Sequence, residues 1–297
     1  MPELPEVETI RLQLDKVLKG LKITGVEVLN PKSFIGNVGE IKNKKVIGVT
    51  RRAKITIIEL ENNIYLAIHL KLTGQLIFRD GVKEIKEKYC EQKDGPFAVC
   101  ELPNKYTRVI ISFDPPSSGS AGLRRASKLY FNDLRMFGWM RVLRDLGDLG
   151  EEKFGPEAND EKTFTLDYFK KILAKTKKPI KLVILDQEKL AGVGNIYANE
   201  ALFHAKILPT RKADSLSGEE VNKLRDSIIS VLKEAIAHKG SSDRDEAYRQ
   251  ITGEKGTHQN YLSVYGKAGQ KCPRCQGTIK RIAIGGRGTF FCPNCQK

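Results

Sequence analysis

The spacing of apolar residues changes along the first half of the chain, from a helical period to a period of two. Apolar side chains from Val7 to Val17 recur at helical spacing, which predicts a helix over residues 5–19 that ends at Gly20. From residue 21 to about residue 143 the period becomes two, and β-branched residues alternate in short runs such as KITIIEL and TRVIISF. One terminal helix followed by many short strands predicts a β-sandwich or β-barrel domain.

Helical patterns return in the second half of the chain. Residues 144–160 have the composition of a linker, and residues 163–178 then form an amphipathic pattern. Residues 217–239 are the best-marked helix, because they open with the S-x-x-E spacing of a capping box. Between these patterns, residues 180–205 predict helix, glycine turn and helix. Within the strand-rich half, PPSSGSAGLRRAS at 115–127 predicts an extended hairpin loop.

The charge of the chain points to a partner. Lysine and arginine number 51 against 36 acidic residues, which gives a formal net charge of +15. This excess favours nucleic acid, because cationic side chains that neutralise phosphates release counterions. The sequence has no apolar run of about 18 residues and no basic-then-apolar leader, so we expect an intracellular protein that does not enter a membrane.

Four of the six cysteines lie in the C-terminal tail. Cys272-Pro-Arg-Cys275 is followed, after sixteen residues, by Cys292-Pro-Asn-Cys295. Two such pairs predict one Zn²⁺ ion bound by four thiolates, and a closed four-cysteine site is structural. The alternative is a pair of redox dithiols, which the proline in each pair and the β-like sequence between them disfavour. We expect the zinc to support a hairpin whose glycine-rich turn presents Arg287.

Two shorter motifs suggest contacts with nucleic acid. In LAGVGNIYANE, glycines precede Asn195 at the start of a helix, and a helix N-terminus attracts anions such as phosphate. In DLRMFGWM, Arg135 and Phe137 share a turn from which an aromatic ring could enter a base stack. Each motif has a plain structural alternative: an ordinary turn between helices for the first, and a core phenylalanine beside a surface arginine for the second.

The start of the chain, MPELPEVET, holds an unusual candidate nucleophile. Methionine before a small residue is normally removed, which would leave Pro2 as a free secondary amine. An α-amino group titrates near about pH 8, so its neutral form is available to form a Schiff base with an aldehyde-like carbon. The neighbouring Glu3 carboxyl could move protons in such a reaction, and Glu6 follows three residues later. The alternative is a charged chain end without a role.

The chain resembles the bacterial formamidopyrimidine-DNA glycosylases in motifs that keep the family's order: MPELPEVET, RRAK, HLKLTG, LRMFG, LAGVGNIYANEALF, QNYLSVYG and a four-cysteine finger with GRGTFFC. The resemblance spans nearly the whole chain. It implies an α+β multidomain fold: an N-terminal helix and β-sandwich domain (1–150), a helical helix–two-turn–helix domain (151–260) and a C-terminal zinc-finger hairpin (261–297).

The same resemblance implies a bifunctional repair enzyme, a DNA glycosylase and AP lyase. Family members excise oxidised purines such as 8-oxoguanine and formamidopyrimidines from double-stranded DNA through a Schiff base, and then nick the abasic site by β,δ-elimination. Damaged duplex DNA is the implied partner. The resemblance further implies a monomer in the bacterial cytoplasm, associated with the nucleoid and independent of membranes.

Four residues match catalytic residues of the family. Pro2 is the implied nucleophile toward C1′ of the damaged nucleotide, and Glu3 is the implied acid/base for opening the sugar. Lys54 in RRAK and Arg287 in the finger are implied to hold phosphates and to assist β- and δ-elimination, respectively. The residues implied to contact DNA are Glu6, His69, Leu72, Tyr106, Arg135, Phe137, Lys177, Lys181, Asn195 and Tyr265. Arg135 and Phe137 match the pair that fills the space left by the flipped base, which must leave the duplex to be reached.

Departures from the family's usual motifs bear on base preference. Leu72 stands where HLGMTG has a methionine, Tyr106 where many relatives have a histidine, and Met136 where DPRRFG has a second arginine. The segment 83–128 is longer than usual. The expected lesion-capping loop, SSDRDEAYRQITGEKG at 241–256, has an atypical composition.

Two other functions stay open on the sequence. The endonuclease VIII branch removes oxidised pyrimidines, but it usually begins PEGPE, whereas this chain has PELPE after its methionine. A catalytically silent, zinc-stabilised DNA-binding protein is the second. Such a protein would not need Pro2, Glu3, Lys54 and Arg287 together.

Overall fold

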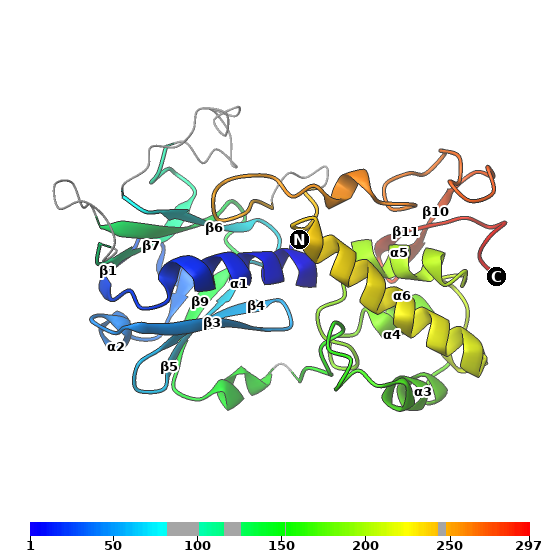
Figure 1. Ribbon diagram of the computed structural model, residues 1–297, viewed down its shortest axis with the longest axis horizontal. Helices are drawn as coiled ribbons and strands as arrows, with labels where there is room; N and C mark the ends of the chain where they lie inside the picture. Colours follow the sequence, from blue (N-terminus) through cyan, green and yellow to red (C-terminus); the bar gives the residue numbers. More distant parts are fainter. Residues whose placement is uncertain (82–100, 116–125, 152, 243–247) are drawn as a thin grey trace. The chain divides into compact units, whose positions relative to one another are not determined.

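The structure, a computed structural model, describes residues 1–81, 101–115, 126–151, 153–242 and 248–297 (Figure 1). Most of the long 83–128 segment therefore lies outside the described residues: residues 82–100 with Cys90 and Cys100, and residues 116–125 of the loop predicted at 115–127. The middle of the 241–256 loop, residues 243–247, lies outside them as well.

The chain forms two compact units, and each draws on two stretches of sequence. The first unit consists of residues 1–151 and 239–259, and the second of residues 152–238 and 260–297. The first contains a helix and two sheets, and the second contains helices and one hairpin. The predicted α+β class is thereby confirmed, while the division at 150 and 260 stays a prediction.

The first unit is the predicted β-sandwich. One sheet has the strand order β1 (Ile23–Val28), β7 (Thr107–Phe113), β8 (Ser127–Asp133), β6 (Gly74–Arg79). The other has the order β2 (Phe34–Ile35), β9 (Trp139–Leu143), β5 (Ile64–His69), β4 (Ile55–Leu60), β3 (Val46–Arg52). All neighbours are antiparallel except the short β2–β9 pair. Two short helical segments join strands of this unit, η1 (Pro31–Ser33) and α2 (Val38–Ile41), and a third, η3 (Leu146–Glu151), follows β9.

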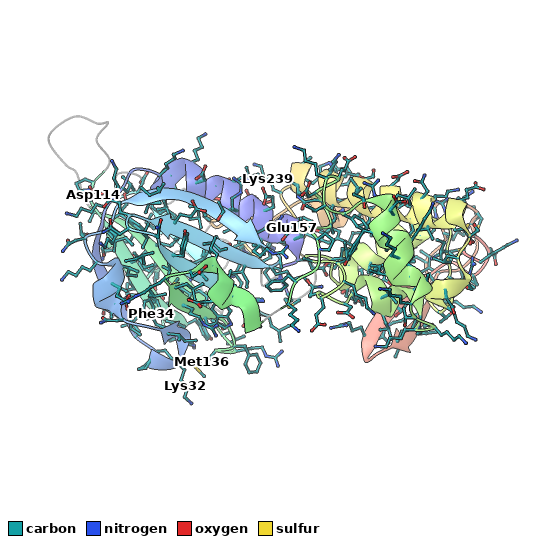
Figure 2. All side chains as sticks on the ribbon, turned by 90° about the horizontal axis from the view of Figure 1, so that it is seen from below. Lys32, Phe34, Asp114, Met136, Glu157 and Lys239 are labelled. Atoms are coloured by element: carbon teal, nitrogen blue, oxygen red, sulfur yellow. The ribbon has the colours of Figure 1, made fainter. Side chains whose placement is uncertain are left out.

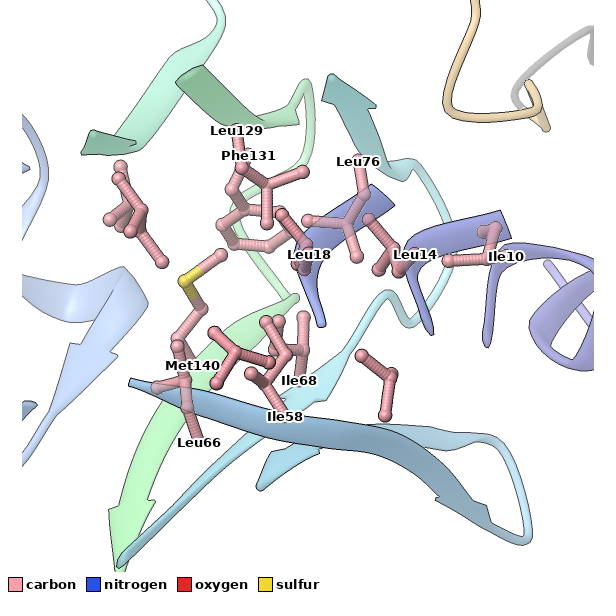
Figure 3. Packing of buried hydrophobic residues seen from close by; sticks show 14 of the residues in the cluster. Ile10, Leu14, Leu18, Ile58, Leu66, Ile68, Leu76, Leu129, Phe131 and Met140 are labelled. Atoms are coloured by element: carbon pink, nitrogen blue, oxygen red, sulfur yellow. The ribbon is translucent and has the colours of Figure 1, made fainter. Parts of the chain in front are cut away.

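Helix α1 (Leu4–Leu18) buries its apolar face in the core of the sandwich. Ile10, Leu14 and Leu18 are fully buried and share one cluster with residues from both sheets (Figure 3). The helix begins one residue before the predicted start, and Gly20 at φ +89° lets the chain leave it. Core packing therefore fixes the helix that follows directly after the first residues of the chain.

The second unit is helical. Its elements are α3 (Leu166–Ala174), α4 (Ile180–Ile184), α5 (Asn195–His204), η4 (Ala213–Ser215), α6 (Gly218–Ala237), η5 (His258–Asn260, at the unit boundary) and the hairpin β10 (Lys280–Ile284) and β11 (Arg287–Phe291). The predicted capping box of α6 is present, because Ser217 Oγ accepts the Glu220 N–H and the Glu220 carboxylate accepts the Ser217 N–H. Among the described residues, no helix combines the length and apolar character needed to cross a bilayer.

Candidate active site and nucleic-acid interface

The predicted nucleophile Pro2 and its neighbour Glu3 lie directly before α1, and Glu3 is the N-cap residue of this helix. Pro2 and Glu3 are both buried. The Glu6 carboxylate holds the first turn of the helix: Oε2 accepts the Glu3 N–H at 2.8 Å, and Oε1 accepts the Ser241 N–H at 2.7 Å. The first N–H groups of a helix lack partners within it, so an acid here stabilises the helix start. With 1% of its surface exposed, Glu6 supports the chain end from inside, which differs from the predicted DNA contact.

The segment 239–259 supports the same turn. Gly240 has φ +75°, and a Cβ at this position would lie 2.9 Å from Glu6 Cγ, so the site requires glycine. Tyr248 Oη donates to the Lys239 carbonyl at 3.0 Å, and burial raises the pKa of its phenol. The described ends of the predicted lesion-capping loop are thus anchored within the unit that carries the chain end.

Lys54 lies in the tight turn between β3 and β4, and it is 7% exposed. Ala53 adopts φ +53° to make this turn. Arg51 fixes it, because Nη1 donates to the Ala53 carbonyl at 2.8 Å and Nε donates to Glu8 Oε2 of α1 at 2.9 Å. The Arg51–Glu8 salt bridge therefore ties the Lys54 turn to the helix that begins beside Pro2.

His69, at the end of β5, is a neutral hydrogen-bond donor. Burial, together with the nearby charges of Lys71 and Lys54, lowers the pKa of its imidazole from 6.5 to about 3. Its Nδ1 accepts the Lys71 N–H at 2.9 Å. In a neutral imidazole one nitrogen accepts and the other donates, so the proton is on Nε2. The site therefore combines two cations with one fixed uncharged donor, an arrangement suited to a phosphate.

Two crossover loops place Arg135, Phe137 and Leu72, three of the predicted DNA contacts, at one end of the sandwich. Residues 70–73 join β5 to β6, and residues 134–138 join β8 to β9. Because β5 pairs with β9 and β6 pairs with β8, the loops lie side by side. Arg135 and Phe137 are exposed, with the guanidinium 5.0 Å from the ring centroid, and Leu72 is partly exposed.

Two of the departures from the family motifs have defined surroundings. Met136 adopts φ +57°, and its Sδ lies 3.2 Å from Asn30 Nδ2. Figure 2 shows Met136 close to Lys32, on the segment that follows β1. Tyr106 is half-buried, and the Lys105 ammonium lies 5.2 Å from the centroid of its ring. Neither side chain is itself charged, and Tyr106 lies beside the Lys105 ammonium.

In the second unit, the β10–β11 hairpin presents Arg287, which is exposed. The pairing of Ile284 with Arg287 leaves Gly285 and Gly286 as a two-residue turn, and both have positive φ. This combination matches the type I′ turn, which suits the twist of a hairpin. A Cβ on Gly285 would lie 2.7 Å from Leu182 Cδ2, so glycine also allows the turn to approach α4.

Two helical side chains hold the hairpin just after its tip. Lys181 Nζ donates to the Gly288 carbonyl at 3.1 Å and to Thr289 Oγ1 at 2.7 Å. Asn195 Nδ2 donates to the same Gly288 carbonyl at 3.1 Å. Lys181 is fully buried, so its ammonium supports the hairpin, whereas the sequence predicted a DNA contact. Asn195 begins α5 as predicted, and its side chain also donates this hydrogen bond to the hairpin.

Tyr265 is positioned by a buried carboxylate. Glu200 on α5 accepts the N–H groups of Ser263, Val264 and Tyr265 at 2.7 to 3.0 Å. Tyr265 is half-buried. Lys177, the other predicted contact of this unit, is exposed before α4.

The four cysteines of the tail form a site that fits zinc. Their Sγ atoms all lie within 4.8 Å of one another, with 3.8 Å between Cys272 and Cys295 and 3.5 Å between Cys275 and Cys292. A tetrahedral site with Zn–S bonds of about 2.3 Å requires S···S separations of about 3.8 Å. Four thiolates leave no open position on the metal, so the zinc would hold the finger together without entering a reaction.

Three family models match successive parts of the chain. They describe the N-terminal domain of formamidopyrimidine-DNA glycosylase at residues 1–140, its H2TH domain at 154–246, and the zinc finger found in FPG and IleRS at 269–297. The formamidopyrimidine-DNA glycosylase of Pelotomaculum thermopropionicum is 38% identical over 305 residues, which cover 100% of this chain and 99% of that relative. This chain belongs to the formamidopyrimidine-DNA glycosylase family.

Solved structures of formamidopyrimidine-DNA glycosylases match the fold over its full length. The Lactococcus lactis Fpg in complex with an abasic site containing DNA has a TM-score of 0.82 at 32% identity, covering 99% of each chain. The MutM (FPG) protein from Thermus thermophilus has a TM-score of 0.81 at 34% identity, covering 99% of this chain and 98% of that one.

Family motifs locate the predicted site residues but not all of the buried side chains that support them. Sequence reasoning missed Glu200, whose bonded partners lie 63 to 65 residues further along the chain. It also missed Arg51, although RRAK contains it, because its partner Glu8 belongs to another motif. For Glu200, the available signal was a charged residue inside an apolar helical pattern, since buried charges must be paired.

The depressed pKa of His69 predicts a pH dependence of folding stability. Between pH 6.5 and about 3 the unfolded chain binds a proton at this imidazole and the folded chain does not. The unfolding free energy should therefore fall as pH falls through this window. His69→Gln should flatten the curve, measured by urea unfolding at a series of pH values. Parallel curves for the two proteins would show that His69 titrates normally in the folded state.

Because Lys181 is buried, its loss should lower the affinity for DNA without changing the salt dependence of binding. Lys181→Met should weaken binding about three- to tenfold by loosening the finger, without changing the slope of log affinity against log salt. Lys177→Met is the matched control, and loss of an exposed phosphate contact should make that slope shallower by about one unit. Fluorescence anisotropy over a salt series measures both. A shallower slope for Lys181→Met would mean that its ammonium contacts phosphate directly.

Proposed function

We propose that this chain excises oxidised purines, such as 8-oxoguanine and formamidopyrimidines, from duplex DNA and then nicks the abasic site by β,δ-elimination. Membership in the formamidopyrimidine-DNA glycosylase family supports the reaction class. One observation carries the proposal for this chain: its second residue is a buried proline at the start of a helix, with a buried glutamate beside it. A disordered chain end would not have this arrangement.

The chemistry begins at the Pro2 nitrogen. Met1 is 43% exposed, and its removal leaves the Pro2 nitrogen as a secondary amine. This amine attacks C1′ of the damaged nucleotide, the base departs, and an iminium ion links protein and sugar. Glu3 supplies and removes the protons needed to open the sugar ring.

Two cationic side chains, one from each unit, serve the two eliminations. Loss of a C2′ proton from the iminium expels the 3′ phosphate, and a second elimination expels the 5′ phosphate. Lys54, beside the neutral donor His69, holds phosphate and assists the first step. Arg287, presented by the zinc-supported hairpin, grips phosphate and assists the second step. Both steps need positive charge where negative charge develops on a leaving oxygen.

Side chains of the two crossover loops fill the space that the extruded base leaves in the duplex. A base must leave the stack before C1′ can be attacked, and the vacated space must be occupied. Arg135 and Phe137 enter this space together, with Leu72 from the neighbouring loop as a third filler. Tyr106, Lys177, Asn195 and Tyr265 contact the flanking phosphates.

The partner follows from the same proposal. Relatives in this family form complexes with damaged DNA, including one with Fapy-dG containing DNA and one with oxidized pyrimidine containing DNA. We propose damaged double-stranded DNA as the partner of this chain, bound by a monomer in the bacterial cytoplasm. The net charge of +15 favours this association.

Base release tests the proposal directly. Duplexes that carry 8-oxoguanine, an oxidised pyrimidine or no lesion are incubated with enzyme, and the free base is measured by mass spectrometry. We expect release of 8-oxoguanine and strand ends that carry phosphate on both sides of the gap. Arg287→Ala should still release the base, but the products should shift toward those of β-elimination alone, because the second step loses its cation.

Two results would overturn the proposed function. DNA binding without release of any base would favour the silent DNA-binding protein. Release of the oxidised pyrimidine with none of 8-oxoguanine would favour an endonuclease VIII type of activity.

A further inference from the structure

A single carboxylate joins the two crossover loops. Asp133 is the last residue of β8 and is 1% exposed. Its Oδ1 accepts from Thr73 Oγ1 at 2.5 Å and from the Arg135 N–H at 3.2 Å, and its Oδ2 accepts the Gly138 N–H at 2.7 Å. Thr73 belongs to the loop of Leu72, while the other two donors belong to the loop of Phe137.

Thr73 completes this arrangement from the other side. Its Oγ1 accepts the Arg135 N–H at 3.1 Å while it donates to Asp133. The backbone N–H of a residue predicted to enter DNA is thus shared between a hydroxyl and a carboxylate. A hydrogen bond to an ionised acceptor is stronger than one between neutral groups, so these bonds restrict the loop more than ordinary turn contacts would.

The surrounding backbone leaves little freedom for this carboxylate. A Cβ on Gly138 would lie 2.8 Å from Phe131 Cζ and 3.1 Å from Asp133 Oδ2, so glycine allows the loop to close onto the acid. On the other side, Arg108 Nε donates to the Asp133 carbonyl at 2.8 Å. Asp133 is therefore held at its backbone and at both carboxylate oxygens.

We propose that Asp133 and Thr73 form a clasp that fixes the two crossover loops as one unit, so that Leu72, Arg135 and Phe137 enter the duplex together when the damaged base leaves. Both are positioning residues. The inference rests on the proposed glycosylase function and goes beyond it, because it assigns the coordination of base extrusion to a buried carboxylate. Loosening the clasp should slow the steps that require extrusion and spare the steps that follow it.

Conservative variants separate the clasp from general stability. Thr73→Val removes the hydroxyl and keeps the branched shape, and Thr73→Ser restores the hydroxyl. Asp133→Asn keeps the size of the side chain but turns one acceptor into a donor, which faces either the Gly138 N–H or the Arg135 N–H. Thr163→Val is the matched control, because Thr163 Oγ1 also donates to a carboxylate, that of Asp160, at 2.8 Å.

The experiment compares two single-turnover rates for each full-length protein. One is excision of 8-oxoguanine opposite cytosine, and the other is cleavage of a ready-made abasic site. We expect Thr73→Val and Asp133→Asn to slow excision about tenfold and abasic-site cleavage about twofold or less, with Thr73→Ser and Thr163→Val near wild type. The rise in 2-aminopurine fluorescence beside the lesion, which reports unstacking, should slow together with excision.

The outcomes distinguish this inference from the proposed function. Equal losses in both rates, or unchanged excision in Thr73→Val and Asp133→Asn, would overturn the clasp. Failure of Thr73→Ser to restore both excision and the fluorescence rise would overturn it as well. A wild-type protein that nicks abasic DNA but never excises 8-oxoguanine would contradict the proposed function instead.

Discussion

The carboxylate of Glu6 constrains the part of the chain on which the proposed chemistry depends. A chain end normally frays, because few contacts oppose its conformational entropy. Here the first helix is buried along Ile10, Leu14 and Leu18, and Glu6 extends this order to the residues before the helix by accepting the Glu3 N–H. The same carboxylate accepts the Ser241 N–H, so one buried acid links the start of the chain to the segment that follows α6.

Buried charged side chains also support the loops of other predicted DNA contacts. Asp133 organises the crossover loops, Glu200 holds the backbone before Tyr265, and Lys181 supports the hairpin behind Arg287. Each is a buried charged side chain whose partners include groups of a functional loop. Loops have few apolar contacts of their own, so buried hydrogen bonds to a rigid helix or strand supply the order that reacting and inserting groups need.

The sequence predicted those features of the fold and of the site that are marked by residues close together in the chain. Helix α6 was predicted well because its capping box and apolar stripe are local. The spacing of the four cysteines predicted the zinc site by itself, and family resemblance assigned roles to Pro2, Lys54 and Arg135, which belong to short motifs. The supporting residues have partners far away in sequence, and nothing local marks them. Lys181 and Glu6 therefore had to be placed by motif alone, and the structure buries both.

The most direct measurement is borohydride trapping of the protein–DNA adduct, comparing processed protein with protein that retains Met1. Both have the same side chains, and they differ in whether the Pro2 nitrogen is an amine or a peptide nitrogen. On a duplex with 8-oxoguanine, the processed protein should give a covalent band that maps to the N-terminal peptide, and the Met1-retaining protein should bind DNA without a band. A band of equal strength from the Met1-retaining protein, or one that maps to a lysine, would contradict catalysis by the chain end.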